Sequence, residues 1–326
     1  VESAYYVWVN GELAGYAEDS RLPSHFNVTK LLKKGSNKLA VKVFRYSDGS
    51  YLEGQDYWKY SGIERDVYLY ARPQSRVRDF RMTAELVNDY KDGELNLDVL
   101  LHQPKVGETV EVKVLDEGRE IYNRKKSITS TTDTLFSQQE IFPNIRAWNA
   151  ETPNTYTLVV STFDAQGKPL ESFTHLFGFR TVEMRNGMQM INGKAVLFKG
   201  VNRHEHDPYK GRTISVASMI HDIQLMKQFN LNGVRNCHYP NCSAWYELCT
   251  EFGLYMVDEA NIESHGMMDH KDGTLANYPD WELPFMQRMS RMIARDRNYS
   301  AIVTCPWVMN PGMANILKRC TIILRK

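Results

Sequence analysis

The sequence lacks the features that would place it in several special classes of protein. Its 326 residues contain no run of the roughly 18–20 apolar residues that a membrane-spanning helix needs. Basic residues number 40 and acidic residues 39, and the net charge of +1 gives no electrostatic reason to bind nucleic acid or an anionic membrane. The five cysteines form no CxxC pair, which argues against a structural zinc site, and their odd number argues against a disulfide framework. We therefore expect a globular protein of a reducing compartment, with the cytoplasm favoured.

The start of the chain has no signal-peptide pattern. Its first residues already alternate as a strand does, and Asn10-Gly11 is the strongest short signal of a β-hairpin. We therefore expect the chain to begin inside a domain. A targeting segment would then not be visible, so a periplasmic location stays open beside a cytoplasmic one.

Two β-rich stretches fill the first 181 residues. In residues 1–73, period-2 alternation continues from the hairpin into residues 39–44 and 66–70, which we predict to be strands. Residues 74–181 hold several further short strands separated by turn signals, a pattern typical of an immunoglobulin-like β-sandwich. A length two to three times that of a usual domain agrees with this division.

From residue 182 the pattern changes to strands that alternate with helices. Short strands are predicted at residues 195–200, 232–235, 254–258 and 301–304. Between them, helices are predicted at residues 216–226, 243–252 and 281–297. Such alternation implies parallel β/α units, and four strands make half of a β/α-barrel.

Polar clusters follow the first three of these strands. They are Gly200-Val-Asn-Arg-His-Glu-His-Asp207, Arg235-Asn-Cys-His-Tyr-Pro240 and Asp258-Glu-Ala-Asn-Ile-Glu-Ser-His265. In a barrel the carboxyl ends of the strands meet at one mouth, where active sites are built. Histidines and carboxylates gathered there could bind a divalent metal, hold a polyol substrate or transfer protons. The alternative is that each is a satisfied polar residue at a strand end.

Five ordered motifs carry a resemblance that runs from Val1 to about Thr304. They are Ser47-Asp-Gly-Ser-Tyr-Leu-Glu-Gly-Gln-Asp-Tyr-Trp58, Asn202-Arg-His-Glu-His206, Val234-Arg235 with His238-Tyr-Pro240, Asp258-Glu-Ala-Asn-Ile-Glu-Ser-His-Gly266 and Arg295-Asp-Arg-Asn298. Together they resemble the large bacterial β-galactosidases of glycoside hydrolase family 2.

The resemblance implies a multidomain protein that combines β and α/β domains. Residues 1–73 would be the C-terminal part of a jelly-roll sugar-binding domain, and residues 74–181 an immunoglobulin-like β-sandwich. Residues 182–304 would be the first half of a catalytic TIM-type β/α-barrel.

The same resemblance assigns residues to a site. Asp56 would contact a galactose hydroxyl and bind a sodium ion. Glu263 and His265 would bind a magnesium ion beside the site, although magnesium prefers oxygen ligands and water to imidazole. His204 and His238 would hydrogen-bond galactose in the transition state.

Three further residues carry alternatives. Arg235 would orient a catalytic carboxylate through its planar fork, or form a structural ion pair at the barrel rim. Trp58 and the tyrosines beside it would stack on a sugar face or, as is more usual, pack in a core. Cys237, next to His238, suggests a thiol nucleophile, but nothing supplies an orienting third group, so we expect a small buried residue.

Both catalytic glutamates of the family are missing. Retaining hydrolysis needs two carboxylates roughly 5–5.5 Å apart, and in the family the acid/base Glu belongs to an Asn-Glu pair after the fourth barrel strand. Here Cys305-Pro-Trp-Val-Met-Asn-Pro311 follows that strand, and residues 301–326 contain no Asp or Glu. These residues can be encoded as TGT CCC TGG GTA ATG AAT CCN. Read from the third base, the same codons give Ser-Leu-Gly-Asn-Glu-Ser, the family's sequence at this point. We therefore expect residues 305–326 to be a frameshifted tail.

The sequence thus predicts an internal piece of a retaining β-galactosidase acting on terminal β-D-galactosides such as lactose, with Mg²⁺ and Na⁺ assisting. The galactoside is the only expected partner, with no nucleic acid or membrane, and intact relatives are expected to be homo-oligomers. The chain as written is expected to be inactive, and its residues 182–326 to be marginally stable. One alternative is a non-catalytic carbohydrate-binding protein. Another is a metal-dependent hydrolase that uses His204, His206, His238 and His265.

Overall fold

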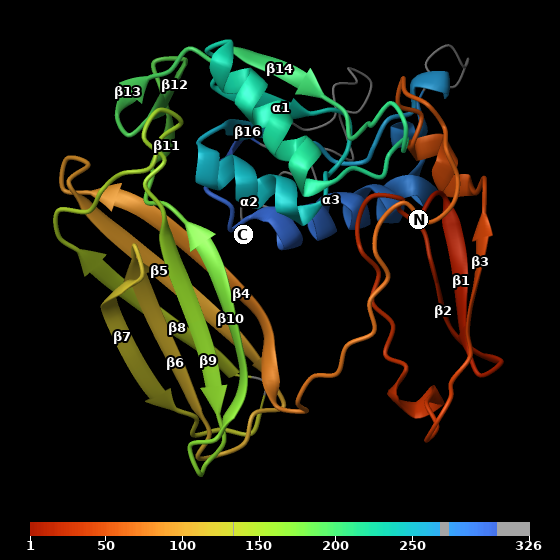
Figure 1. Ribbon diagram of the computed structural model, residues 1–326, viewed down its shortest axis with the longest axis horizontal. Coiled ribbons are helices and arrows are strands. Elements are labelled where there is room, and N and C mark those ends of the chain that lie inside the picture. The colour runs from red at the N-terminus through yellow and green to blue at the C-terminus, as the bar shows by residue number, and fades with distance from the viewer. Residues whose placement is uncertain (133, 268–273, 305–326) are drawn as a thin grey trace.

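A computed structural model describes residues 1–132, 134–267 and 274–304. Residues 305–326, and with them the predicted frameshifted tail, lie outside the described residues. Figure 1 shows a small sheet at one side, a long β-sandwich at the other, and an α/β unit that joins the two at the top. In the described part of the chain, no helix has the length and apolar character to cross a membrane.

The small sheet is antiparallel and has the strand order β2-β1-β3. Its strands are β1 (Ala4–Val9), β2 (Glu12–Ala17) and β3 (Leu39–Phe44). The turn between β1 and β2 has Asn10 at φ 53° and Gly11 at φ 90°, the positive values that a tight type I′ hairpin requires. The predicted hairpin is therefore confirmed.

The predicted strand at residues 66–70 is wrong. No regular structure occurs there, and Val67 and Leu69 are 62% and 77% exposed. A strand is held by ladder hydrogen bonds to a neighbour, and no described strand pairs with this segment. Alternation in the sequence indicates two faces but does not supply the neighbour.

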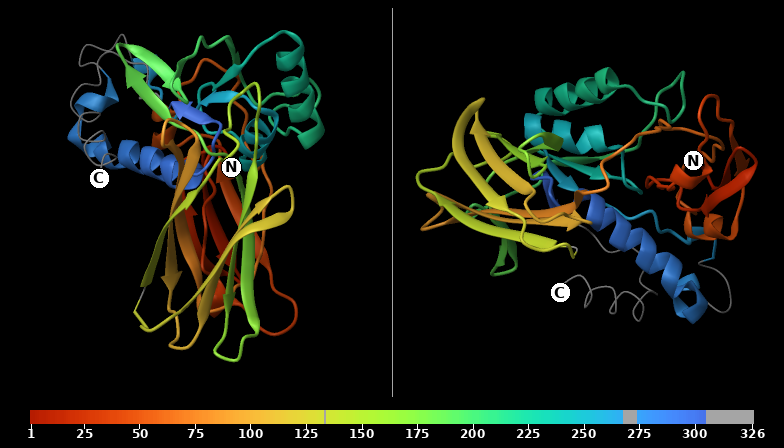
Figure 2. Two further views of the ribbon diagram at one scale, coloured as in Figure 1. Left: turned by 90° about the vertical axis from the view of Figure 1, so that its left-hand side faces the viewer. Right: turned by 90° about the horizontal axis from the view of Figure 1, so that it is seen from below.

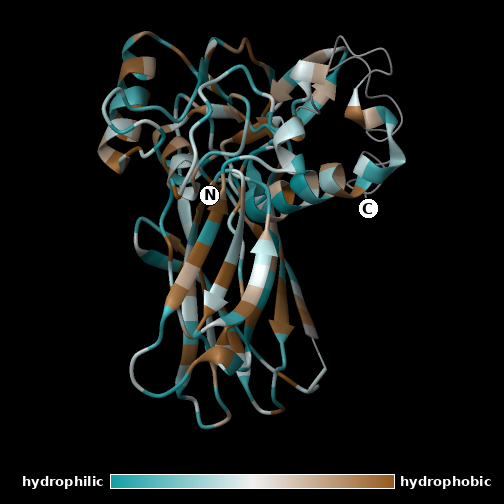
Figure 3. Cartoon of the chain, turned by 90° about the vertical axis from the view of Figure 1, so that its right-hand side faces the viewer, coloured by the Kyte–Doolittle hydropathy of each residue, from teal (hydrophilic) through white to brown (hydrophobic). Residues whose placement is uncertain are grey.

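The long sandwich has two antiparallel sheets, in the strand orders β4-β5-β8 and β10-β9-β6-β7. Its strands are β4 (Arg76–Val87), β5 (Asp92–His102), β6 (Thr109–Asp116), β7 (Arg119–Ser127), β8 (Thr134–Phe142), β9 (Tyr156–Phe163) and β10 (Pro169–Phe177). Along β5 and β9, buried and half-buried residues alternate strictly, and Figure 3 shows apolar and polar colours alternating along the strands. The alternation buries one apolar core between the sheets, which is the immunoglobulin-like arrangement predicted from the sequence.

The α/β unit contains a parallel four-stranded sheet in the order β14-β15-β16-β17. Its strands are β14 (Gly200–Arg203), β15 (Gly233–Asn236), β16 (Tyr255–Val257) and β17 (Ile302–Thr304), and its helices are α1 (Val216–Gln228), α2 (Ser243–Phe252) and α3 (Glu282–Asp296). We call this unit the barrel segment. Figure 2 shows α1 and α2 on one side of the sheet, and their buried residues Met219, Ile223 and Trp245 share a core with β15 and β16. Four parallel strands with intervening helices match the predicted half of a barrel.

The first strand of this unit begins later than predicted. Residues 196–199 form no strand, and Leu197 is 76% exposed. Lys194–Ala195 is instead β13, which closes a small antiparallel sheet with β11 (Val182–Arg185) and β12 (Met188–Ile191). The parallel ladder with β15 starts only at Gly200, and no described strand lies on the other side of β14.

Asn298, the last residue of a quoted motif, joins the barrel segment to the sandwich. Its side-chain oxygen accepts a hydrogen bond from Met82 N at 3.0 Å, and its amide nitrogen donates to Phe80 O at 3.1 Å. His175 Nε2 lies 3.0 Å from the backbone oxygen of Asn298. Asn298 therefore serves the contact between two parts of the molecule.

Candidate active site

A loop from the first part of the chain crosses to the barrel segment. We call residues 47–58 the crossing loop. Gly54 N donates to Glu263 O at 2.7 Å, and Glu263 N donates to Leu52 O at 2.6 Å, so the loop pairs with the segment after β16 like a short strand. Gln55 Nε2 adds a buried hydrogen bond of 2.9 Å to Asn261 Oδ1. These contacts fix the loop beside the strand ends.

Gly54 is required for this close approach. A Cβ atom at that position would lie 2.9 Å from the backbone oxygen of Glu263, closer than carbon and oxygen atoms normally come. Just before it, Ser47 N donates to Ser50 Oγ at 3.0 Å at the start of the short helix Asp48–Leu52. The local sequence thus shapes the loop, and the glycine lets it dock.

The end of the crossing loop meets the polar cluster that follows β14. The Tyr57 ring stacks on His204 with centroids 4.1 Å apart and planes 2° apart, and its hydroxyl donates to Glu205 O at 3.3 Å. Trp58 lies against His206 with ring centroids 4.4 Å apart, but 57% of it is exposed. The expectation that Trp58 packs in a core is therefore wrong. Asp56, the residue before Tyr57, is exposed.

His204 and His238 face each other across the ends of β14 and β15. Their ring centroids are 5.4 Å apart at 75°, and both residues are half-buried. Burial, followed by the nearby His238 and Arg235, lowers the pKa of His204 to about 4. The imidazole is consequently neutral at pH 7, with one nitrogen as donor and one as acceptor. This state suits hydrogen bonding to sugar hydroxyls.

Arg235 holds a carboxylate that the sequence analysis did not single out. Its Nε and Nη2 donate to Oε2 and Oε1 of Glu259 at 2.6 and 2.9 Å, and Nη2 also lies 3.0 Å from His238 Nδ1. Burial would raise the pKa of Glu259, but hydrogen bonds from His238 and Arg235 outweigh it and lower the pKa. The ionised pair orients His238. The only sequence signal for Glu259 is its place in the third polar cluster.

A buried network lies beneath the strand ends. Tyr246 Oη donates to Asp258 Oδ1 at 2.6 Å, while Arg295 forks onto Asp296 at 2.6 and 2.8 Å. Burial, and then the charge of Asp296, raise the pKa of Asp258 to about 8. Because Arg295 donates both of its hydrogen bonds to Asp296, Asp296 carries the negative charge and Asp258 is the carboxyl that stays neutral at pH 7. It supports the site as a hydrogen-bonding group rather than as a charge.

Glu263 and His265 lie together on the segment that pairs with the crossing loop. Glu263 Oε1 and His265 Nδ1 are 3.3 Å apart, and their side chains are 23% and 61% exposed. Octahedral magnesium at about 2.1 Å from each ligand places neighbouring ligands about 3 Å apart, so the spacing of the pair fits such an ion. Exposure leaves room for the waters that magnesium keeps. The carboxylate of Asp56 is likewise a hard oxygen donor that suits sodium.

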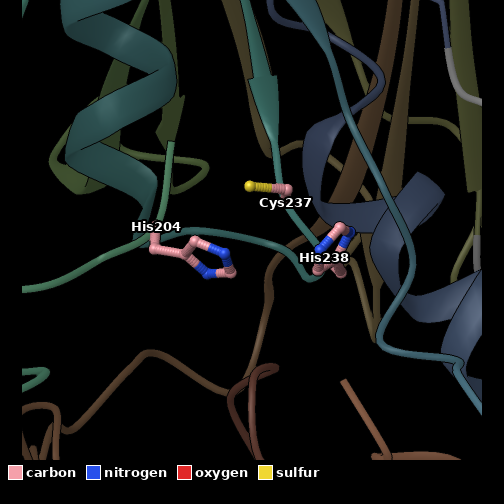
Figure 4. Close-up of side chains that lie close together, drawn as sticks. All are labelled: His204, Cys237 and His238. Carbon is pink, nitrogen blue, oxygen red and sulfur yellow. The ribbon is translucent and has the colours of Figure 1, made fainter. Parts of the chain in front are cut away.

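The structure thus brings together most of the residues that the resemblance selected. His204, His238 and Arg235 lie at two neighbouring strand ends, and Asp56 is on a loop held to Glu263. The four-histidine site of the metal-hydrolase alternative does not form. Among the described residues, the one group of three possible metal ligands within 4.8 Å is His204, Cys237 and His238, which includes neither His206 nor His265 (Figure 4).

Comparison with protein families gives three consecutive matches. Residues 1–73 match the model described as "Glycosyl hydrolases family 2, sugar binding domain", and residues 75–180 match "Glycosyl hydrolases family 2". Residues 182–316 match "Glycosyl hydrolases family 2, TIM barrel domain".

Curated relatives are similar over almost the whole chain. The chain is 43% identical over 316 residues to a β-galactosidase of Priestia megaterium, covering 93% of this chain and 31% of that protein. It is 45% identical over 312 residues to a β-galactosidase of Pseudoalteromonas haloplanktis, covering 93% and 30%. The chain therefore spans about a third of the length of these relatives.

Solved structures share the fold. A β-glucuronidase from Ruminococcus gnavus in complex with D-glucaro-δ-lactam has a TM-score of 0.82 at 22% identity, covering 98% of this chain and 56% of that one. A β-glucuronidase of Parabacteroides merdae has a TM-score of 0.81 at 18% identity, covering 99% and 42%. At these identities the likeness concerns the fold, with its jelly-roll part, sandwich and partial barrel.

Proposed function

The chain belongs to glycosyl hydrolase family 2, a family of glycosidases, and from that premise we propose that it is the galactose-holding part of a retaining β-galactosidase. The observation that carries the proposal is the docking of the crossing loop on the barrel segment, which stacks Tyr57 on His204. This contact gathers sugar-binding residue types from two distant parts of the sequence. The names of the relatives point to terminal β-D-galactosides, such as lactose, as the substrates.

The roles follow from the chemistry of each group. Neutral His204 would donate to one galactose hydroxyl and accept from another, His238 would form a further hydrogen bond to the sugar, and Asp56 would accept from another hydroxyl. Sugar rings present both hydroxyl edges and apolar faces, so the exposed Trp58 offers a surface on which such a face could stack. Arg235 and Glu259 would act as positioning residues because they orient His238.

Ions would add positive charge beside this site. Glu263 and His265 would hold Mg²⁺, and Asp56 would hold Na⁺ while contacting the sugar. When bound, magnesium supplies a fixed charge that strengthens nearby hydrogen bonds to the substrate. The residues of the chain alone would still position the ring.

The two carboxylates needed for retaining hydrolysis have no evident candidates among the described residues at the strand ends. Glu259 accepts two hydrogen bonds from Arg235. Glu205 is buried and accepts hydrogen bonds from Arg65 and from Cys242 N. The catalytic acids would therefore come from sequence that this chain does not carry. We propose that the 326-residue chain binds galactose weakly and does not turn over galactosides.

The test compares galactose binding with turnover. Titration calorimetry should show that the chain binds D-galactose more tightly than D-glucose, and a chromogenic galactoside should release no product. His204→Ala and His238→Ala should each weaken galactose binding at least about tenfold, the effect of losing one or two hydrogen bonds. His221→Ala, on the exposed side of α1, is the matched control.

Two outcomes would contradict the proposal. If galactose and glucose bind equally, and binding is unchanged in the His204 and His238 variants, the strand ends are not a galactose site. Steady product release by the purified chain would show that its own residues supply the catalytic acids.

A further inference from the structure

The strand ends contain one chemically reactive group that sugar binding does not use, the thiol of Cys237. Cys237 is 1% exposed and lies at the end of β15, directly before His238. Figure 4 shows its sulfur on the side where His204 lies. One ligand atom from each of His204, Cys237 and His238 lies within 4.8 Å of the other two. Two imidazoles and a thiol at this spacing are a ligand set for a thiophilic cation.

We propose that His204, Cys237 and His238 bind a divalent cation of the zinc type, and that the bound ion occupies the place of the galactose ring. Zinc accepts sulfur and imidazole ligands in tetrahedral geometry, and three protein ligands leave a fourth position open for water. Magnesium would not compete, because it prefers oxygen ligands and this set offers none.

The geometry needs only a small contraction. Zinc–sulfur and zinc–nitrogen distances of about 2.3 and 2.1 Å place tetrahedral ligands about 3.3–3.6 Å apart. The ligand atoms, all within 4.8 Å of one another, must then move together by about 1–1.5 Å, which side-chain rotation can supply. His204 and His238 are half-buried, so an ion can reach the ligand atoms from their exposed side.

Neighbouring groups can hold each imidazole in the tautomer that binds metal. His204 Nδ1 lies 3.4 Å from Tyr239 Oη, so a proton on Nδ1 can be donated to that oxygen while Nε2 faces the ion. His238 Nδ1 lies 3.0 Å from Arg235 Nη2, which can only donate, and 3.6 Å from Glu259 Oε1. His238 would therefore bind the ion through Nε2 once its proton moves to Nδ1, where Glu259 replaces Arg235 as the partner. Metal-binding histidines usually have such an oxygen partner on the second nitrogen.

Binding changes one protonation state. The Cys237 thiol loses its proton to the solvent as the sulfur–zinc bond forms, and both imidazoles bind as neutral groups. Burial raises the pKa of the free thiol to about 11, so the thiol stays protonated until the metal arrives. His204 is already neutral at pH 7, because its pKa is lowered to about 4. Zinc affinity should therefore rise with pH.

The experiment uses Zn²⁺ and its spectroscopic substitute Co²⁺. Cys305→Ser and Cys320→Ser are placed in the full chain, because those thiols lie outside the described residues. Calorimetry should give one Zn²⁺ per chain, and Co²⁺ should show a thiolate-to-metal charge-transfer band. Cys237→Ser should abolish the band and weaken Zn²⁺ binding at least about 100-fold, since changes even to outer-shell partners cost 10–100-fold. Cys242→Ser is the matched control, as Cys242 is also a described free thiol near β15.

Competition with sugar tests the second half of the proposal, which rests on the proposed function. Zn²⁺ should abolish galactose binding in the parent chain but not in Cys237→Ser. A Co²⁺ band that survives Cys237→Ser, or Zn²⁺ binding unchanged by it, overturns the metal site. If Zn²⁺ binds through Cys237 but the chain never binds galactose, the metal site stands and the galactose function fails.

Discussion

Trp148 should hold the barrel segment against the sandwich. It lies between β8 and β9, is fully buried, and belongs to the core that contains α1, α2 and β16. Its indole nitrogen donates to Thr250 O at 2.8 Å. Thr250 is in the last turn of α2, where backbone oxygens have no partner within the helix, so the indole caps the helix from another part of the molecule.

Two substitutions separate the packing of the indole from its hydrogen bond. Trp148→Ala removes a large buried side chain, which costs about 3–5 kcal/mol, and leaves Thr250 O without its donor, which adds about 1–3 kcal/mol. Trp148→Phe keeps most of the packing and should cost mainly the hydrogen bond, about 1–3 kcal/mol. Because a domain is stable by only about 5–15 kcal/mol, the alanine variant should detach the barrel segment.

Urea unfolding followed by circular dichroism measures the loss of stability, and limited proteolysis shows whether the barrel segment has detached. The alanine variant should unfold in two steps, and protease should cut residues 182–304 while the sandwich survives. The phenylalanine variant should fall between the alanine variant and the parent chain. Trp58→Ala is the control, because Trp58 is 57% exposed and its loss should change the free energy of unfolding little. An alanine variant with the parent's midpoint and a single transition would refute the reasoning.

Three further substitutions test the site and its support. Burial raises the pKa of Asp258 from 3.8 to about 8, so its contribution to stability is present below about pH 4 and is lost as pH rises through about 8. In Asp258→Asn the urea midpoint should therefore vary less with pH across this range than in the parent chain. A pH dependence equal to that of the parent chain would contradict the assignment. Gly54→Ala places a Cβ 2.9 Å from Glu263 O and should cost about 1–3 kcal/mol in urea unfolding, whereas Gly266→Ala meets nothing within 4 Å and should cost less. Tyr57→Leu removes the ring that stacks on His204 and should weaken galactose binding about 2- to 12-fold by calorimetry, the equivalent of an aromatic pair. Tyr209→Leu, at a residue 95% exposed, should leave that affinity unchanged.

Elements with local signals were predicted closely from the sequence. The hairpin at Asn10-Gly11 follows from two residues that accept positive φ, and α2 (Ser243–Phe252) has the predicted bounds. Residues 66–70 and 196–199 were predicted as strands and are not, although both have apolar residues in a suitable pattern. A helix satisfies its hydrogen bonds within one segment, whereas a strand depends on a neighbour that the segment itself does not encode.

The site shows the same division between local and distant information. His204 and His238 could be selected because parallel strands carry their following residues to one edge, which is a rule of topology. The contacts of Tyr57 with His204 and of Glu259 with Arg235 were not predicted, because the two residues of each pair are distant in the sequence. The supporting hydrogen bond from Gln55 to Asn261 likewise spans 206 residues. What joins these distant parts is a backbone contact at Gly54, where any side chain would meet Glu263 O. The specificity of the site thus depends on a residue that contributes no functional group, since without the docked loop Tyr57 would not lie beside the histidines.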